Sequence, residues 1–384
     1  AVCGTRQDQA ATQVHDIGVF IVRNDQGEIG FRVLAGGGLG RTPVIGHEMI
    51  PYIEKQHLLT FLEAILRVYN RLGRRDNKYK ARIKILVKET GVDEFRAKVL
   101  KEWEKIKGKS MTLTEEEIAR CKSFFTDPAY RQLSAVSPAL NKALAENVLF
   151  ASWCDQNVSP HRKAGYAIVT VSLKQTGVAP GDVTSAQMNF LADLADKYSF
   201  GELRVSHQQN IILADVEKEQ LPALWQALNS SALATGNLGL LTDIICCPGG
   251  DFCALANAKS IPIAESIQRN FADQALLKDI GDLTINISGC MNACGHHHVG
   301  NIGILGVDKK GEEFYQISLG GSADNHTSLG DVMGPSFAQE EIPRVIADVI
   351  DVYRGNRQPA EKFIETYRRI GIQPFKDRVY AKTD

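Results

Sequence analysis

The sequence has no dominant charge, no long apolar run and no signal-peptide pattern. It carries 44 Lys or Arg and 45 Asp or Glu over 384 residues, a formal net charge of −1. This balance argues against a nonspecific nucleic-acid binder, which depends on excess positive charge. No run of about 18 apolar residues is present, so we expect no transmembrane helix. These absences predict a cytoplasmic protein without a nucleic-acid or membrane partner.

Hydrophobic residues make up 44% of the chain and charged residues 23%, the balance of a soluble globular protein. The length corresponds to two or three domains. Strand patterns alternate with helical ones, which predicts an α+β fold built from α/β sandwich units. The expected elements are a short strand at 82–88, a strand at 165–173, a helix from Thr184 to Lys197 with Thr184 as its N-cap, two strands and a tight turn within 202–216, and a helix at 221–228.

An internal repeat relates residues 13–40 to residues 298–321. Each copy has an apolar strand, a charged turn, a second strand that ends in paired glycines, and then a helix. The interval from the first paired glycine to a helix tyrosine is 33 residues in both copies (Gly36 to Tyr69, Gly320 to Tyr353). The matched interval indicates a duplicated scaffold rather than a chance similarity.

Five of the eight cysteines lie between residues 246 and 294. Cysteines clustered in this way, in a chain without a signal peptide, favour metal binding or reactivity over disulfides. The second scaffold copy is preceded by Cys290 and Cys294, whereas the corresponding segment of the first copy, Thr5–Gln9, has no cysteine.

Four cysteines form two local pairs, Cys247 with Cys253 and Cys290 with Cys294, spaced C-x5-C and C-x3-C. Four thiolates in two pairs suit a cubane cluster, in which each iron takes one cysteine. Glycines beside both pairs allow a close approach of the backbone. Structural zinc sites favour shorter spacings, so zinc is the weaker alternative, as are buried inert thiols. Cys246 is an alternative ligand to Cys247.

The motifs CCPGGDFC and SGCMNACG, with the duplicated scaffold and the unit at 160–216, resemble the sirohaem and [4Fe-4S] sulfite and nitrite reductase haemoprotein family. The resemblance covers essentially the whole chain and is greatest to the bacterial assimilatory sulfite reductase β subunit. It implies pseudo-duplicated α/β sandwich units and a [4Fe-4S] cluster coupled to sirohaem. It also implies that Cys247, Cys253 and Cys290 complete the cluster and that Cys294 bridges it to the sirohaem iron.

The same resemblance implies several polar contacts to the carboxylate-rich macrocycle. Arg82 and Lys84 lie in a basic segment where the family meets these carboxylates. Asn292 is a candidate hydrogen-bond donor to cluster sulfur. One of His296–His298 would also donate a hydrogen bond near the cluster and tune its potential, or these histidines simply pack or face solvent. The glycine run Gly36–Gly38 would allow close approach of a cofactor or simply kink a strand end. A polar turn of the family also faces the macrocycle, and here it holds Arg204, Gln208, Gln209 and Asn210; the alternative is an ordinary hairpin turn.

The implied activity is the six-electron reduction of sulfite to sulfide in sulfur assimilation, with nitrite reduction to ammonia as the alternative. A ferredoxin or a flavoprotein would donate the electrons to a small anion substrate. A non-catalytic iron–sulfur carrier and a zinc-stabilised interaction module are the competing hypotheses.

The family binds its anionic substrate with Lys and Arg side chains that align upstream of Ala1, so no catalytic residue is assignable. We therefore expect an N-terminally truncated chain, with better binding of the cluster than of sirohaem and little sulfite reduction. The expected domains are a cysteine-free scaffold copy at 1–115, a connector at 116–158, a ferredoxin-like half-domain at 159–232, and a second scaffold copy with the cofactor site at 233–384.

Overall fold

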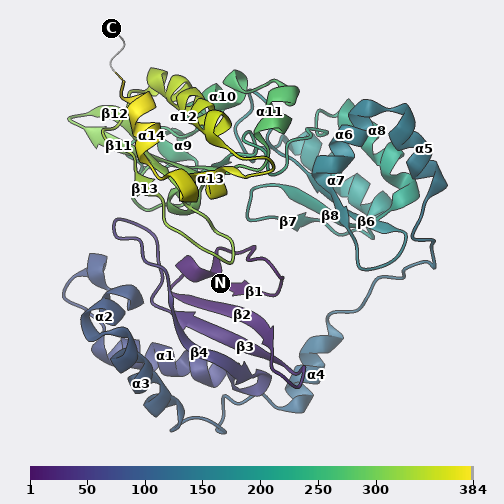
Figure 1. Cartoon of the computed structure of the whole chain (residues 1–384). Coiled ribbons are helices and arrows are strands. Elements are labelled where there is room, and N and C mark those ends of the chain that lie inside the picture. Colours follow the sequence, from purple (N-terminus) through teal and green to yellow (C-terminus); the bar gives the residue numbers. More distant parts are fainter. Residues whose placement is uncertain (382–384) are drawn as a thin grey trace. The chain divides into compact units, whose positions relative to one another are not determined.

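The computed structural model describes residues 1–381, and its contacts divide the chain into two compact units. Unit 1 comprises residues 1–127 and 322–329, and unit 2 comprises residues 128–321 and 330 onwards. Figure 1 labels the helices and strands of both units. In the described part of the chain, no helix is both long and apolar enough to cross a membrane.

Unit 1 contains a sheet of order β1-β2-β3-β4 with helices packed on one face (Figure 1). One face of helix α1 is fully buried, and its apolar residues Phe61, Ala64, Ile65 and Val68 recur at helical spacing. This face, the sheet and helices α2 and α3 enclose one hydrophobic core. The elements are β1 (Val2–Cys3), β2 (Ile17–Arg23), β3 (Ile29–Ala35), β4 (His47–Glu54), α1 (Leu58–Leu72), α2 (Ile83–Thr90), α3 (Val92–Trp103) and α4 (Glu115–Ser123).

The strand expected at 82–88 is wrong, because these residues form helix α2. The run of branched apolar residues there suggests a strand, but Ile83, Leu86 and Val87 are buried at a helical spacing of three and four residues. Packing of this face against the unit 1 core decides the conformation.

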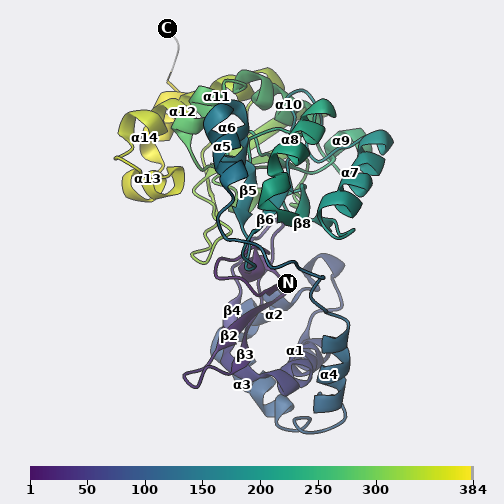
Figure 2. The same ribbon diagram turned by 90° about the vertical axis from the view of Figure 1, so that its right-hand side faces the viewer.

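The first part of unit 2 is a sheet of order β5-β6-β8-β7 covered by helices (Figure 2). Its strand, turn and helix pattern confirms the elements expected between 165 and 228, including the Thr184 N-cap, whose side chain forms a capping box with Gln187. Helices α5 and α6 lie in residues 116–158, where the sequence analysis expects a connector and no helix. The elements are α5 (Pro138–Glu146), α6 (Val148–Asn157), β5 (Val158–Pro160), β6 (Tyr166–Val171), α7 (Ser185–Tyr198), β7 (Arg204–Val205), β8 (Ile211–Glu217) and α8 (Leu221–Ser230).

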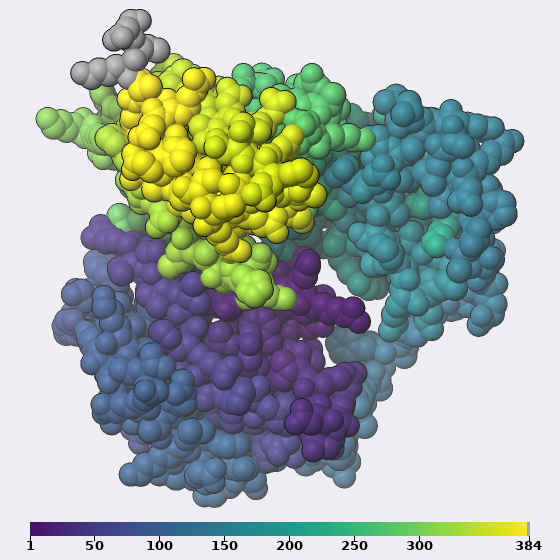
Figure 3. Space-filling model, in the orientation of Figure 1, coloured from purple at the N-terminus to yellow at the C-terminus, as the bar shows by residue number. Residues whose placement is uncertain are grey.

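The second part of unit 2 is a mixed sheet of order β13-β12-β11-β10-β9. Helices α12 to α14, yellow in Figure 3, form one continuous surface of this part. The elements are β9 (Ile245–Cys246), α9 (Gly249–Phe252), α10 (Ile261–Asn270), α11 (Gln274–Ile280), β10 (Ile285–Ser288), β11 (Ile302–Lys309), β12 (Glu312–Leu319), β13 (Asp331–Val332), α12 (Ile342–Asn356), α13 (Phe363–Ile370) and α14 (Gln373–Val379).

The two scaffold copies share details that a chance similarity would not produce. Val2 pairs with Val19 in parallel strands, and Ile285 pairs with Ile302, seventeen residues on in both cases. In each copy a left-handed residue then opens a single 3-10 turn, Ala11 in the first and His296 in the second. The duplication inferred from the repeat is confirmed at the level of strand register and turn conformation.

Candidate functional site

The two cysteine pairs begin at the ends of two neighbouring parallel strands. Strand β9 pairs with β10 in parallel, with Cys246 opposite Ile287. Cys247 follows β9 directly, and Cys290 follows β10 after one glycine. Because parallel strands have their carboxyl ends at the same edge of a sheet, both cysteine loops start beside each other.

Gly289 brings the two loops into contact. Its N–H donates a hydrogen bond to Cys247 Sγ at 3.1 Å. A Cβ at this position would lie 2.6 Å from the Ala258 carbonyl oxygen and 2.9 Å from Gly249 Cα, so no larger residue fits. The Gly289 carbonyl accepts from the N–H groups of Asn257 and Ala258, at 2.8 and 3.1 Å. Glycine is therefore required where the C-x3-C loop crosses the C-x5-C loop.

All four predicted ligands have free thiols, and the other three affect the thiol of Cys294. Partial desolvation raises the pKa of the Cys294 thiol, although the residue as a whole is exposed, and Cys247, Cys290 and Cys253 raise it further. Four thiolates this close repel one another unless a strongly positive group neutralises them. An iron cluster supplies such charge, so these residues fit the group.

A zinc site and an iron cluster need different spacings between the sulfur atoms. Within residues 1–381, no three side chains of His, Cys, Asp or Glu converge closely enough to hold one metal ion. Thiolates on one tetrahedral zinc would stand about 3.8 Å apart, given zinc–sulfur bonds of about 2.3 Å. In a four-iron cluster each cysteine binds a different iron, so the sulfurs stand farther apart.

Cys246, the alternative ligand, has its side chain in the hydrophobic core of this part of unit 2. Burial raises the pKa of its thiol, and the nearby Cys247 raises it further. A buried, neutral thiol is an inert packing group rather than a metal ligand. The geometry thus favours Cys247 over Cys246.

The histidines after Cys294 differ from one another. His296 Nδ1 lies 3.2 Å from the Cys294 carbonyl oxygen. His297 is buried, and neither of its ring nitrogens has a hydrogen-bond partner within the described residues. Burial lowers the pKa of His297 to about 3, with smaller contributions from His298 and His296. His297 is therefore neutral in the folded chain at ordinary pH.

The neutral His297 predicts a loss of stability in acid. The unfolded imidazole takes a proton below about pH 6.5, whereas the folded one stays neutral down to about pH 3, so stability present above pH 6.5 falls as the pH falls between these values. His297→Phe is expected to remove this contribution, about 1.4 kcal/mol per pH unit. Urea unfolding of both chains at pH 7, 6, 5 and 4 measures it, and parallel pH profiles would contradict it.

The predicted macrocycle contacts of unit 1 have partners within that unit. Arg82 caps helix α2 and forms two hydrogen bonds with Asp16, at 2.9 and 2.8 Å. Lys84 is buried, and its ammonium donates to the carbonyls of Gly38, Leu39 and Thr42, at 3.3, 2.7 and 2.7 Å. Arg82 is half-exposed and retains a free face, whereas the donors of Lys84 are all used to hold the glycine loop.

The polar turn of unit 2 also divides into inward and outward residues. Arg204 is exposed and pairs with Glu202. Asn210 is fully buried, accepts from the Leu173 N–H at 3.0 Å and donates to Asp243 at 3.1 Å. Asn292 is exposed between the cysteines, and its contact to cluster sulfur stays a prediction.

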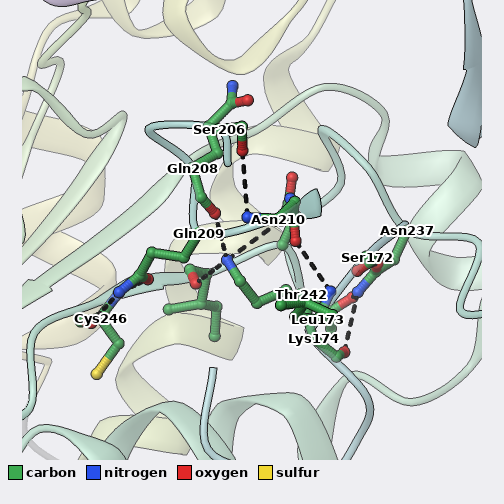
Figure 4. A network of polar contacts seen from close by, with 12 residues as sticks. Ser172, Leu173, Lys174, Ser206, Gln208, Gln209, Asn210, Asn237, Thr242 and Cys246 are labelled. Carbon is green, nitrogen blue, oxygen red and sulfur yellow. Dashed lines mark hydrogen bonds and ion pairs between the residues drawn. The ribbon is translucent and has the colours of Figure 1, made fainter. Parts of the chain in front are cut away.

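Lys174 lies beside the polar turn of Gln208, Gln209 and Asn210, and the sequence analysis does not single it out (Figure 4). It is only 1% exposed and donates to the carbonyls of Gln208 and Ile244, at 2.8 and 2.7 Å. The available signal was a lysine that directly continues the apolar run 165–173.

The chain belongs to the nitrite and sulphite reductase 4Fe-4S domain family, which matches residues 1–107 and 240–384. The nitrite/sulfite reductase ferredoxin-like half domain matches residues 160–231. A [4Fe-4S] cluster coupled to sirohaem is the cofactor set of this family. The membership confirms the family resemblance and the duplicated α+β fold expected from the sequence.

Similar proteins include both nitrite and sulfite reductases. The chloroplastic ferredoxin–nitrite reductase of Zea mays is 28% identical over 353 residues, covering 88% of this chain and 54% of that protein. Sulfite reductase (ferredoxin) 1 of Mycolicibacterium paratuberculosis is 23% identical over 363 residues, covering 91% and 58%. The chain thus spans little more than half the length of these relatives.

A solved structure supports the fold independently. The Mycobacterium tuberculosis NirA protein matches with a TM-score of 0.71 and 21% identity, covering 96% of this chain and 62% of that one. At this identity, the similarity shows the fold alone.

Proposed function

We propose that the chain holds a [4Fe-4S] cluster through Cys247, Cys253, Cys290 and Cys294. The observation that carries the proposal is the hydrogen bond from the Gly289 N–H to Cys247 Sγ, because it joins the two ligand loops. The effect of Cys247, Cys290 and Cys253 in raising the pKa of the Cys294 thiol supports the same set. An N–H donor to a ligating sulfur stabilises negative charge there and so raises the reduction potential of a cluster.

We further propose that Cys294 links the cluster to sirohaem. It is the exposed thiol of the four, so one side of it is open to a second group. Sirohaem held beside Cys294 would supply the redox chemistry for a small anion substrate. Of the predicted macrocycle contacts, Arg82, Arg204 and Gln208 have side chains at least partly accessible, and we propose them as candidates. The exposed Asn292 is the proposed hydrogen-bond donor to cluster sulfur.

The proposed reaction is six-electron reduction of sulfite to sulfide, with uptake of six protons and release of three waters. Nitrite reduction to ammonia is the second candidate, because several relatives are named nitrite reductases. A ferredoxin is the proposed donor, with a flavoprotein as the alternative. We also propose a cytoplasmic location and the four domains expected from the sequence, at 1–115, 116–158, 159–232 and 233–384.

The visible spectrum of anaerobically purified chain, supplied with iron, sulfide and sirohaem, tests the cofactors. A broad shoulder from the cluster and a Soret band with a red chlorin-like band from sirohaem are expected, and a spectrum without either contradicts the proposal. Steady-state assays of the cofactor-loaded chain with both anions test the substrate. A higher kcat/KM for nitrite than for sulfite would contradict sulfite as the substrate and favour nitrite.

A further inference from the structure

The side chain of Gln209 pairs with both backbone groups of Cys246. The Cys246 N–H donates to Gln209 Oε1 at 3.0 Å, and Gln209 Nε2 donates to the Cys246 carbonyl at 2.8 Å (Figure 4). Strand β9 is the edge of its sheet, with β10 on its inner side. The Gln209 amide therefore occupies the place of a further strand and satisfies an otherwise open edge.

The turn that carries Gln209 is itself closed by hydrogen bonds. The Ser206 N–H donates to the Asn210 carbonyl at 2.9 Å, and the Gln209 N–H donates to the Ser206 carbonyl at 3.1 Å. Gln209 adopts a left-handed φ of +60°, which is uncommon for a residue other than glycine. This conformation directs its side chain away from the hairpin and toward β9.

Lys174 ties the same turn to the segment that leads into β9. Its buried ammonium bonds the Gln208 carbonyl on one side and the Ile244 carbonyl on the other, and lies 3.4 Å from Asp243 Oδ1. A charge this deeply buried persists only when it is paired and hydrogen-bonded, as it is here. The turn and β9 are therefore held together by one charged group and one amide.

Asn210 and Asp243 complete the network. Asp243 accepts from Asn210 Nδ2 at 3.1 Å and from the Gly239 N–H at 3.0 Å. Asn237 donates to the Lys174 carbonyl at 3.3 Å and accepts from Ser172 at 2.6 Å. A buried polar network with its members satisfied holds one arrangement of the backbone.

The position of Cys247 depends on this hydrogen-bond network. It follows Cys246 directly, and its N–H donates to the Ile287 carbonyl of β10 at 3.1 Å. We propose that Gln209 is a positioning residue for the cluster, which holds the first ligand loop through the backbone of Cys246, and that Lys174 fixes the turn of Gln209. This inference rests on the proposed function, because it requires a cluster at Cys247.

The test compares variants of the cluster-loaded chain under anaerobic conditions. Gln209→Ala removes both hydrogen bonds, and Gln209→Glu keeps an acceptor for the Cys246 N–H but loses the donor. Gln209 is only half-buried, so both variants are expected to fold. Gln226→Ala, an equivalent change at an exposed position of α8, is the matched control.

The readouts are the rate of iron loss to a chelator and the electron paramagnetic resonance spectrum of the reduced cluster. We expect Gln209→Ala to lose iron about ten times faster, because it leaves the Cys246 N–H and carbonyl without their partners, with a changed and broadened spectrum. Gln209→Glu should fall between Gln209→Ala and wild type, while Gln226→Ala should match wild type. Lys174→Met, if it folds, should resemble Gln209→Ala.

An unchanged spectrum and rate in Gln209→Ala would overturn the inference while leaving the proposed function intact. A lower melting temperature with an unchanged spectrum would do the same, because it would show a purely structural role. Failure of the wild-type chain itself to bind iron would instead contradict the proposed function.

Discussion

Cys247→Ser is expected to lose its iron almost completely, from about four atoms per chain to less than one. The cluster needs one soft thiolate for each iron, and a serine hydroxyl is a harder and far less acidic ligand. Removal of one of four ligands also opens an edge of the cluster to water. Iron and acid-labile sulfide per chain, after anaerobic reconstitution, measure the loss.

The adjacent cysteine provides the matched control. Cys246→Ala changes a neighbouring residue whose side chain is 3% exposed and packs in the core. It should keep its iron and lose only modest stability, because the substitution removes one buried sulfur. The reverse result, with iron lost in Cys246→Ala and kept in Cys247→Ser, would assign the ligand to Cys246.

Gly295→Ala is expected to destabilise the folded chain by about 3 kcal/mol, the upper end of the usual cost of overpacking. A Cβ at Gly295 would lie 1.9 Å from the carbonyl oxygen of Ile287 and 2.8 Å from its carbon. Both atoms are backbone of β10, so no side-chain rotation relieves the clash. The loop after Cys294 would move away from β10, and its hydrogen bonds to Ser288 and Asn286 would break.

Thermal unfolding and iron content of Gly295→Ala should fall together. Gly355→Ala is the control, because Gly355 lies in α12 and a Cβ there meets no atom within 4 Å. Alanine is the better helix former, so this variant should gain up to about 1 kcal/mol. Wild-type stability in Gly295→Ala would show that the C-x3-C loop does not depend on this close approach.

The cysteine set could be proposed from the sequence because the spacing of ligands is a property of the sequence itself, and it stays a prediction. The convergence of the two loops was not, since it depends on the parallel pairing of β9 and β10, whose short strands lie about forty residues apart. Gly289 and Gly295 flank the second pair in the sequence, but only the structure shows which atoms they approach.

The basic residues were harder to interpret. A lysine in the sequence reveals its charge but not its partner, and Lys84 and Lys174 both donate to backbone carbonyls of distant segments. Their roles depend on tertiary contacts that no local pattern encodes. Arg82 and Arg204 remain candidates because part of each side chain is accessible.

Helices α5 and α6 illustrate a local signal that was present but not used. Ser137 precedes Pro138 and accepts from the Leu140 N–H, and Asn147 caps α6 in the same way. A capping residue followed by proline is typical of a helix start. The capping residues of α5 and α6 could therefore have been recognised in the sequence. The helical conformation of α2 could not, because it depends on packing against the core.

The most direct test of the central claim is metal and sulfide analysis of the wild-type chain, combined with Mössbauer spectroscopy of the iron. The account predicts about four irons and four sulfides per chain, with the spectrum of a [4Fe-4S] cluster. One zinc per chain without iron, or no bound metal in the folded chain, would contradict it.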